Sequence, residues 1–240
     1  MLAHVHATIG EPSNWGKWPG GWPGDIEAAL VDAVLSARAV YRSKRGRGIY
    51  ANVVDWRDAR DRRNWALDAL IAEIDAAGVS NWARKFGEPP GVPAPPSFRA
   101  IRLLKAAAVR HAASALREHG INEASQIDIN NVKGVKLALR SVPGIGYATS
   151  NYFLMLLGAP GVKPDRMIHR FLKEATGHAF TDTEAERTTR AAAEQLCVQS
   201  HEIDHAIWRF ESMRAQQRPL GRQHQAKTAN PGAAQTAAGS

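Results

Sequence analysis

Apolar residues recur at steps of three and four along most of this 240-residue chain, and proline and glycine separate the recurring stretches. The stretch that follows Asp25 shows the pattern, with Ile26, Ala29, Leu30 and Ala33 on one helical face. No stretch alternates apolar and polar residues at every second position over a length that would indicate a strand. The chain is therefore expected to adopt an all-α fold.

Capping residues and prolines set the expected helix boundaries. Asp25 is typical of an N-cap, and the spacing of Thr181 and Glu184 matches a capping box. The helices are expected over residues 26–37, 54–77, 98–118, 128–141, 146–157, 165–175, 181–198 and 200–213. Residues 11–24 are rich in glycine, proline and tryptophan, and we expect them to form an ordered arm.

Positive charge is in modest excess, and part of it lies in a tail. The formal charge is +8 and the isoelectric point is about 9.9, which favours a polyanionic partner. Four basic residues and no acidic one lie from Arg214 onward, so half of the excess belongs to residues 214–240, an expected disordered basic tail. Charge alone gives weak support for DNA binding, and a basic protein without a nucleic-acid partner stays an open alternative.

The chain lacks the signals of several protein classes. Its one cysteine, Cys197, excludes an intramolecular disulfide, a four-thiolate zinc site and an all-cysteine iron–sulfur cluster. The longest apolar stretch, residues 152–157, is far shorter than the roughly 20 residues that span a bilayer, and the N-terminus does not resemble a signal peptide. His201 and His205 lack a third ligand nearby, so no metal site is expected, and we expect a cytoplasmic protein.

A proline and two glycines separate two expected helices at residues 142–146. Pro143 ends the first helix, and Gly144 and Gly146 permit backbone angles that are closed to other residues. Ile145 between them can pack between the helices. The free amides at the start of the second helix, up to Tyr147, would bind a phosphate oxygen without reading a base. An ordinary tight turn between two helices is the alternative.

A lone aspartate follows this turn in the sequence. One helix ends in the Gly/Pro-rich segment 158–164, and the next begins at Asp165. The common role of an aspartate that precedes an apolar-periodic stretch is the helix N-cap. An N-cap that faces a cleft could also present an oxygen to a ligand, so the capping role and a catalytic role are compatible.

The order of hairpin, apolar helix, Gly/Pro-rich loop and aspartate resembles the helix-hairpin-helix (HhH-GPD) DNA glycosylase superfamily. The resemblance is clearest over residues 137–172 and weaker over residues 29–38 and 203–210. It implies two helical lobes that flank a DNA-binding cleft. Residues 1–30 and 160–213 would form a terminal lobe, and residues 31–159 a helical bundle that ends in the helix-hairpin-helix element, 129–157.

Carried over by position, the resemblance implies that Asp165 is the catalytic aspartate of a base-excising enzyme. A fixed carboxylate suits this chemistry because positive charge builds on the deoxyribose as the base departs. Ala148 stands where strand-cleaving members have a lysine, so strand cleavage through a Schiff base is not expected. Many relatives bind an iron–sulfur cluster, which the single cysteine excludes here. A monovalent cation at the hairpin is the only cofactor that stays open.

The remaining candidate residues lie in or near these motifs. The DNA-binding candidates are Val142, Gly144, Ile145, Gly146, Tyr147, Lys163, Arg166 and Arg38. Arg38 stands where the family often has a glutamine that fills the place of a flipped base. Trp22 and His169 are candidates for a base pocket. The alternatives are that Arg38 is a surface residue, that Trp22 attaches the arm to the core, and that His169 is packed or faces solvent.

Together these features predict a monofunctional DNA glycosylase that removes a damaged, mismatched or modified base from double-stranded DNA in base excision repair. We expect a monomer associated with the nucleoid. A non-catalytic helix-hairpin-helix DNA-binding protein is the alternative, and a protein-binding helical scaffold would require both motifs to be coincidental. The sequence does not identify the base, because pocket walls come from scattered side chains.

Overall fold

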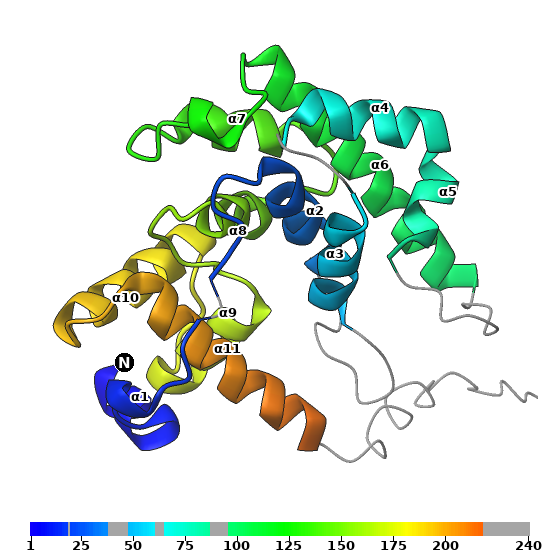
Figure 1. Ribbon diagram of the computed structural model, residues 1–240. Coiled ribbons are helices and arrows are strands. Elements are labelled where there is room, and N and C mark those ends of the chain that lie inside the picture. Colours follow the sequence, from blue (N-terminus) through cyan, green and yellow to red (C-terminus); the bar gives the residue numbers. More distant parts are fainter. Residues whose placement is uncertain (19, 38–47, 61–64, 87–95, 218–240) are drawn as a thin grey trace, which may run out of the picture.

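The computed structural model of the chain describes residues 1–18, 20–37, 48–60, 65–86 and 96–217. Every regular element within these ranges is a helix, which confirms the expected all-α fold (Figure 1). The α-helices are α1 (Leu2–Ile9), α2 (Ile26–Ser36), α3 (Ile49–Asp58), α4 (Leu67–Ala77), α5 (Val79–Arg84), α6 (Pro96–Glu118), α7 (Lys133–Arg140), α8 (Tyr147–Leu156), α9 (Arg166–Thr176), α10 (Asp182–Gln195) and α11 (Ser200–Gln217). Short 3₁₀ turns lie at Pro12–Asn14 and Ala124–Gln126.

Three of these helices begin after a residue whose side chain caps the helix, as the sequence predicted. Asp25 accepts a hydrogen bond from the Ala28 amide at 2.9 Å. At the start of α10, the Thr181 hydroxyl and the Glu184 carboxylate each bond the other residue's backbone amide and form the expected capping box. Asp165 caps α9 with its side chain, which accepts a hydrogen bond from the Met167 amide. These starts were predictable because capping uses neighbours in sequence.

The prediction of a single helix over residues 54–77 is wrong, because α3 and α4 are separate helices. Ala66, just before α4, has extended backbone angles, and its amide donates to the Glu27 carboxylate at 3.0 Å. The next amide, that of Leu67, donates to the Asn122 carbonyl at 2.9 Å. These partners lie far away in the sequence and take the place of bonds that a continuous helix would make.

Several other boundaries also differ from the expectation. The helix expected from residue 128 begins only at Lys133, and α11 continues to Gln217. Arg214, which we placed in the tail, therefore lies in α11, where it pairs with Glu174 and Glu211. The rest of the expected tail, residues 218–240, lies outside the described residues. Helices α1 and α5 were not expected.

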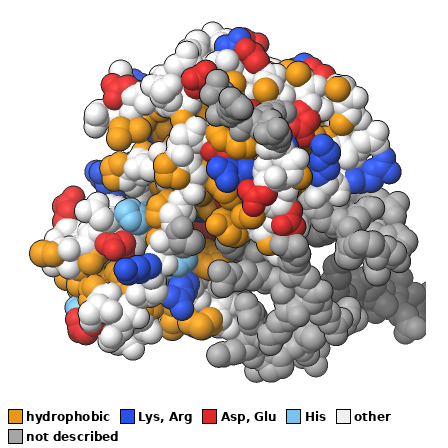
Figure 2. All heavy atoms as spheres, viewed as in Figure 1, with side chains coloured by type: hydrophobic (Ala, Val, Ile, Leu, Met, Phe, Trp, Pro, Cys, Tyr) orange, Lys and Arg blue, Asp and Glu red, His pale blue; other side chains and the backbone are white. Residues whose placement is uncertain are grey.

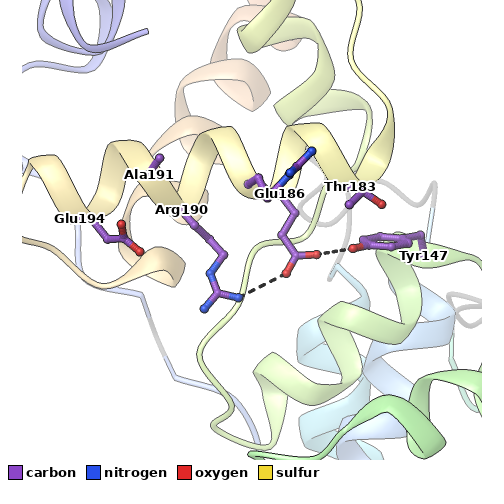
Figure 3. A pocket seen from close by; sticks show the side chains of 7 residues that line it. Tyr147, Thr183, Glu186, Arg190, Ala191 and Glu194 are labelled. Atoms are coloured by element: carbon purple, nitrogen blue, oxygen red, sulfur yellow. Dashed lines mark hydrogen bonds and ion pairs between the residues drawn. The ribbon is translucent and has the colours of Figure 1, made fainter.

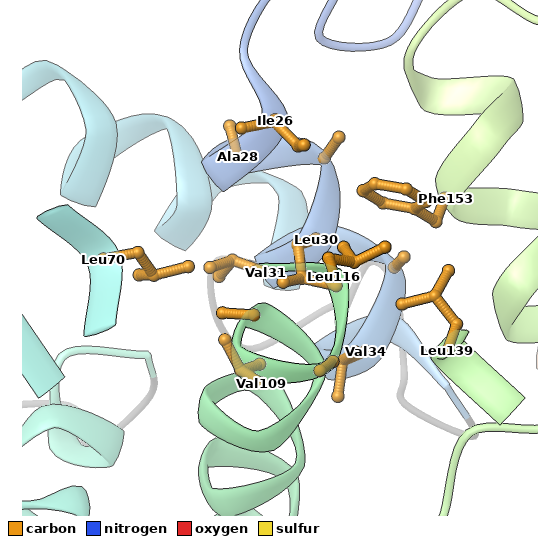
Figure 4. Close-up of a cluster of buried hydrophobic side chains, with 14 of the residues drawn as sticks. Ile26, Ala28, Leu30, Val31, Val34, Leu70, Val109, Leu116, Leu139 and Phe153 are labelled. Carbon is orange, nitrogen blue, oxygen red and sulfur yellow. The ribbon is translucent and has the colours of Figure 1, made fainter. Parts of the chain in front are cut away.

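The larger core surrounds α2, which is buried along its whole length. Figure 4 shows this core, in which Leu116 and Val109 of α6 and Phe153 of α8 face α2. A helix with no exposed face must be enclosed by its neighbours, and α3, α6 and α8 pack against it. Residues 26–30 thus belong to this core, and not to the terminal lobe to which the sequence analysis assigned them.

A second core joins the start of the chain to its later helices. Val5 of α1 packs with Phe171 of α9, Ala192 of α10 and Ile203 of α11. In Figure 1 these four helices lie together below α2 and α8. The fold therefore has two hydrophobic clusters, one around α2 and one formed by α1, α9, α10 and α11.

The N-terminal arm runs between the two clusters and is held by its tryptophans. The indole of Trp15 donates to the carbonyls of Ile9 and Gly10, both at 3.1 Å. Trp22 is buried, and its backbone amide donates to the Leu156 carbonyl at the end of α8. The described residues of the arm, 11–18 and 20–24, are therefore ordered, as expected. Within the described part of the chain, no helix combines the length and the apolar character needed to cross a membrane.

Candidate functional site

The turn between α7 and α8 directs its apolar residues inward and its glycines outward. Val142 and Ile145 are buried in the larger core, whereas Gly144 and Gly146 are exposed. Gly144 has a φ of +92°, a left-handed conformation that favours glycine. Gly146 has an ordinary extended backbone with a φ of −101°, so it does not need to be glycine for its backbone angles. We had expected both glycines to be needed for conformational reasons, and only Gly144 is.

The space around Gly146 gives a different reason for a small residue there. A Cβ atom at Gly146 would have no heavy atom within 4 Å, so the space beside this residue at the start of α8 is open. The first backbone amides of a helix lack helical partners and carry the positive end of the helix dipole. Phosphate binding at this turn stays a prediction.

Tyr147, the first residue of α8, points toward α10. Its hydroxyl donates to the Glu186 carboxylate at 2.6 Å, and the Arg140 guanidinium lies 4.2 Å from the ring centroid. Asn151 also donates to Glu186, at 2.7 Å. Tyr147 and Glu186 line an open cavity of about 520 Å³ along α10. Figure 3 shows Arg190 on the other side of the Glu186 carboxylate. Tyr147 therefore joins the hairpin to α10, and its expected contact with DNA stays a prediction.

Asp165 is the N-cap of α9 and is partly exposed. Its Oδ1 accepts a hydrogen bond from the Met167 amide at 2.8 Å, which confirms the capping role. Its Oδ2 makes no hydrogen bond with the residues that the structure describes. The loop that carries Asp165 lies against the middle of α8, because Asn151 donates to the Val162 carbonyl at 3.2 Å. The carboxylate is thus held in place through Oδ1, whereas Oδ2 is available to a ligand.

Lys163 turns inward beside Asp165. Its ammonium lies 3.7 Å from the centroid of the Tyr152 ring, and its backbone amide donates to Oδ1 of Asp204 at 2.8 Å. Its charge also acts on Asp32 and Lys105, two groups on other helices. Lys163 therefore connects these groups electrostatically, a role that we did not expect for a residue proposed to contact a DNA phosphate.

Asp204 lies in α11 and is buried, with 8% of its surface exposed. Burial and, as a smaller cause, the negative charge of Asp165 together raise the pKa of its carboxyl to about 8. The Lys163 amide and ammonium act in the opposite direction, since both favour the carboxylate. At neutral pH the Asp204 carboxyl is therefore protonated.

Asp32 lies on α2 and is fully buried. Burial raises the pKa of its carboxyl to about 6, against the hydrogen bond that the Trp22 indole donates at 3.0 Å and the charge of Lys163. Its Oδ1 has no hydrogen-bond partner among the described residues. Lys105 of α6 donates to the carbonyls of Leu35 and Ala37 at the end of α2. Burial, with the charge of Lys163, lowers the pKa of Lys105 to about 8.

Five residues form what we call the Lys163 cluster: Asp32, Lys105, Lys163, Asp165 and Asp204. Lys163 interacts electrostatically with Asp32, Lys105 and Asp204, and Asp165 interacts with Asp204. The members of the cluster come from α2, α6, the loop before α9, the start of α9, and α11. Sequence reasoning found only Lys163 and Asp165. The sequence does contain a signal for burial of Asp32 and Asp204. Each is an aspartate inside an apolar-periodic stretch, where Asp32 follows Val31 and Asp204 follows Ile203.

The remaining candidates have other surroundings. Trp22 lies in the larger core with its indole bonded to Asp32, so it attaches the arm and is not available to an extruded base. His169 has its Nε2 2.8 Å from the Asp182 carboxylate, and it joins α9 to α10. Arg166 is exposed beside Asp165. Arg38 lies outside the described residues.

Charge is mixed over the surface. On the face drawn in Figure 2, basic and acidic side chains are interspersed with hydrophobic ones. Among the residues that the structure describes, no three histidine, cysteine or acidic side chains come close enough to hold a metal ion. The monovalent cation that the sequence left open at the hairpin is not tested by this observation.

Comparisons with known proteins give one family. No match is found among curated proteins, and none among solved structures. A family model described as "Domain of unknown function (DUF8548)" matches residues 1–212, which include both cores, the hairpin and the Lys163 cluster. The chain therefore belongs to the DUF8548 family.

Proposed function

We propose that this protein is a monofunctional DNA glycosylase of the helix-hairpin-helix (HhH-GPD) type, which hydrolyses the bond between a damaged, mismatched or modified base and its deoxyribose. The single observation that carries the proposal is the hydrogen bonding of the Asp165 carboxylate. One carboxylate oxygen is fixed by the Met167 amide, and the other makes no hydrogen bond with the described residues. A fixed and available carboxylate is what a reaction through a cationic sugar requires.

The hairpin would hold the DNA beside this carboxylate. The amides of Gly146, which is exposed, and Tyr147 would bind a backbone phosphate, which gives affinity without sequence preference. Asn151, which holds the Asp165 loop, lies little more than one helical turn beyond Gly146. A nucleotide flipped out of a duplex held at the hairpin would therefore be near Asp165.

In the proposed reaction, the bond between C1′ and the base nitrogen breaks, and its electron pair leaves with the base. The sugar becomes positively charged, and the Asp165 carboxylate stabilises this charge more in the transition state than in the ground state. Water then adds to C1′ and transfers its proton to Asp165 or to solvent. The product is an abasic site. Ala148 offers no amine, so the strand would stay intact.

A test that does not require knowledge of the base uses two duplexes with one abasic analogue each. One analogue is a neutral tetrahydrofuran, and the other is a pyrrolidine whose ring nitrogen is protonated at neutral pH. The protein is expected to bind the cationic duplex about tenfold more tightly, as expected for one added ion pair of roughly 1.4 kcal/mol. Asp165→Asn should remove this preference and leave the affinity for the neutral duplex unchanged.

The matched control is Asp75→Asn, which removes a carboxylate from α4 that pairs with Arg110. It should keep the preference. An Asp165→Asn protein that still prefers the cationic duplex would contradict the mechanism. Equal binding of both duplexes by the unsubstituted protein would instead favour a non-catalytic DNA-binding protein. A panel of duplexes with one lesion each, treated with protein and then alkali, would identify the base.

A further inference from the structure

We propose that the open cavity along α10 is a second phosphate-binding site, in which Arg190 binds a phosphate of the DNA strand that the hairpin holds. The inference rests on the proposed function, because it extends the DNA contact of the same hairpin to α10. We call this site the α10 cavity. It is lined by Tyr147 at the start of α8 and by residues of α10, of which the charged ones are Glu186, Arg187, Arg190 and Glu194.

Tyr147 belongs to both the hairpin and the α10 cavity. Its backbone amide is one of those proposed to bind a phosphate, and its side chain lines the cavity. Its hydroxyl donates to the Glu186 carboxylate at 2.6 Å, the contact drawn in Figure 3. A strand with one phosphate at the Tyr147 amide therefore lies within the length of a tyrosine side chain of the cavity, where a further phosphate of that strand can bind.

Arg190 has a guanidinium that is free to bind an anion. Its Nη1 lies 3.6 Å from Oε1 of Glu186, which is an ion pair but is too long for a hydrogen bond. The guanidinium makes no hydrogen bond with the residues that the structure describes, and 47% of the side chain is exposed. A guanidinium presents its donors in a fork that fits two phosphate oxygens. Arg190 can therefore bind a phosphate without breaking an existing hydrogen bond.

Glu186 is held in place from α8 and does not depend on Arg190. Its Oε2 accepts the Tyr147 hydroxyl at 2.6 Å and the Asn151 side-chain amide at 2.7 Å. Because these two bonds fix the carboxylate, Arg190 can turn to a ligand while Glu186 stays where it is. A carboxylate this close to a bound phosphate repels it, so Glu186 is expected to lower the affinity of the site.

Positive charge is in excess around the α10 cavity. The Arg140 guanidinium lies 4.2 Å from the centroid of the Tyr147 ring. Burial lowers the pKa of Lys136, the charge of Glu186 raises it, and the charges of Arg140 and Arg190 lower it again. The lining residues and these two residues of α7 together give four basic and two acidic side chains, a formal excess of two positive charges: Lys136, Arg140, Arg187, Arg190, Glu186 and Glu194.

The shape of the cavity suits a phosphate that stays attached to its strand. Its volume is about 520 Å³, and Arg187, Arg190 and Glu194 on its wall are exposed. Pockets for small ligands are mostly apolar and bury most of the ligand, whereas this cavity is open and its wall is largely charged. A contact to the DNA backbone carries no sequence information, so the site would add affinity for any duplex.

The experiment measures the affinity of the full-length protein for a duplex without a lesion, by fluorescence anisotropy at several salt concentrations. Arg190→Gln is expected to weaken binding about three- to tenfold and to lower the slope of log affinity against log salt by about 0.9, the value for one phosphate contact. Glu186→Gln should instead tighten binding about threefold or more, because it removes the repelling charge, and its amide oxygen can still accept from Tyr147 and Asn151. Partial unfolding would weaken binding in both variants, so it cannot produce opposite changes.

The matched control is the ion pair between Arg110 of α6 and Asp75 of α4, two helices that do not line the cavity. Arg110→Gln and Asp75→Asn change the formal charge by the same amounts and should each alter the affinity less than about twofold, since distant charges are screened by salt. An unchanged affinity and salt slope in Arg190→Gln would overturn the inference, as would weaker or equal binding by Glu186→Gln. A loss in Arg110→Gln as large as that in Arg190→Gln would also overturn it, because net charge alone would then explain the effect.

The failure of the proposed function gives a different result. In that case the unsubstituted protein binds the cationic and the neutral abasic duplex equally, while the Arg190 and Glu186 variants on the duplex without a lesion still decide whether the α10 cavity binds a phosphate. A clear preference for the cationic duplex, together with an unchanged salt slope in Arg190→Gln, would overturn the α10 cavity and leave the proposed function standing.

Discussion

Two aspartates in the interior, Asp32 and Asp204, cost folding free energy whenever they are ionised. Their pKa values are raised to about 6 and about 8, and burial is the main cause for both. An apolar side chain at either position would avoid this cost. Buried carboxyl groups with raised pKa values are frequent in functional sites, where stability is lost in favour of chemistry.

The cost at Asp32 can be measured at two pH values. A pKa of about 6, raised from 3.8, means that the folded state binds the proton more tightly than the unfolded chain. The contribution of Asp32 to stability is therefore greatest below pH 4 and is lost as pH rises through 6, by about 3 kcal/mol in the limit. Asp32→Asn should raise the free energy of unfolding at pH 8 by about 1–2 kcal/mol, less than the limit because the buried amide also needs partners.

Urea unfolding of both proteins at pH 4 and pH 8 tests this prediction. At pH 4 Asp32→Asn should show no gain, since Asp32 is then neutral in the folded state and the cost of the buried amide remains. The exposed variant Asp75→Asn should show no gain at pH 8. A loss of stability in Asp32→Asn at pH 8 would mean that the ionised carboxylate is favourable where it lies.

At the scale of the element, the two hairpin glycines have different roles. Gly144 is in a left-handed conformation with a φ of +92°, whereas Gly146 is extended and open to solvent. A side chain at Gly144 would strain the backbone by about 1–2 kcal/mol. A side chain at Gly146 would meet no protein atom, but it would occupy the space through which a phosphate approaches the α8 amides.

Substitution of Gly146 by aspartate and by asparagine separates charge from shape. Both residues are good N-caps, and Gly146 has the extended backbone of an N-cap, so both variants should be at least as stable as the original. Gly146→Asp is expected to weaken binding to duplexes of any sequence by about tenfold or more, because its carboxylate repels the phosphate. Gly146→Asn should lose much less.

Fluorescence anisotropy with two duplexes of unrelated sequence, at one fixed salt concentration, measures these affinities. Equal affinity of the Asp and Asn variants would indicate that the hairpin is a turn without a phosphate site. Gly144→Ala is the control for the shape of the turn. It should lower the melting temperature, because alanine is strained in the left-handed conformation of Gly144.

At the scale of the whole molecule, Glu186 connects the helices of the two cores. It lies on α10, whose apolar face belongs to the smaller core, and it accepts hydrogen bonds from Tyr147 and Asn151 of α8 in the larger core. The relative position of the two parts determines how far the hairpin lies from Asp165. Contacts of this kind are therefore expected to matter for activity as well as for stability.

Glu186→Ala is expected to lower the free energy of unfolding by about 1–3 kcal/mol, since it leaves the Tyr147 hydroxyl and the Asn151 amide without their acceptor. Thermal or urea unfolding measures the loss. Arg187→Ala on the same helix changes an exposed residue and should stay within about 0.5 kcal/mol of the original protein. A Glu186→Ala protein as stable as that control would show that the contact contributes nothing.

Much of the fold could be predicted because its signals are local. The helix starts after Asp25, Asp165 and Thr181 depend on side chains within three residues of the capped amide. The break before Leu67 could not be predicted, because its amide bonds to Asn122, a residue far away in the sequence. The same applies to Trp22, whose place in the core depends on Asp32 and α8.

The sequence by itself determined the all-α class, the exposed glycine turn and the position of Asp165 at the start of a helix, since each follows from the conformational preferences of neighbouring residues. Only the tertiary structure decided that Lys163 turns inward, and that Asp32 and Asp204 are buried near it. The physical reason is that the pKa of a carboxyl depends on burial and on charges brought together from different helices. These charges belong to residues that are distant in the chain and meet only when it folds.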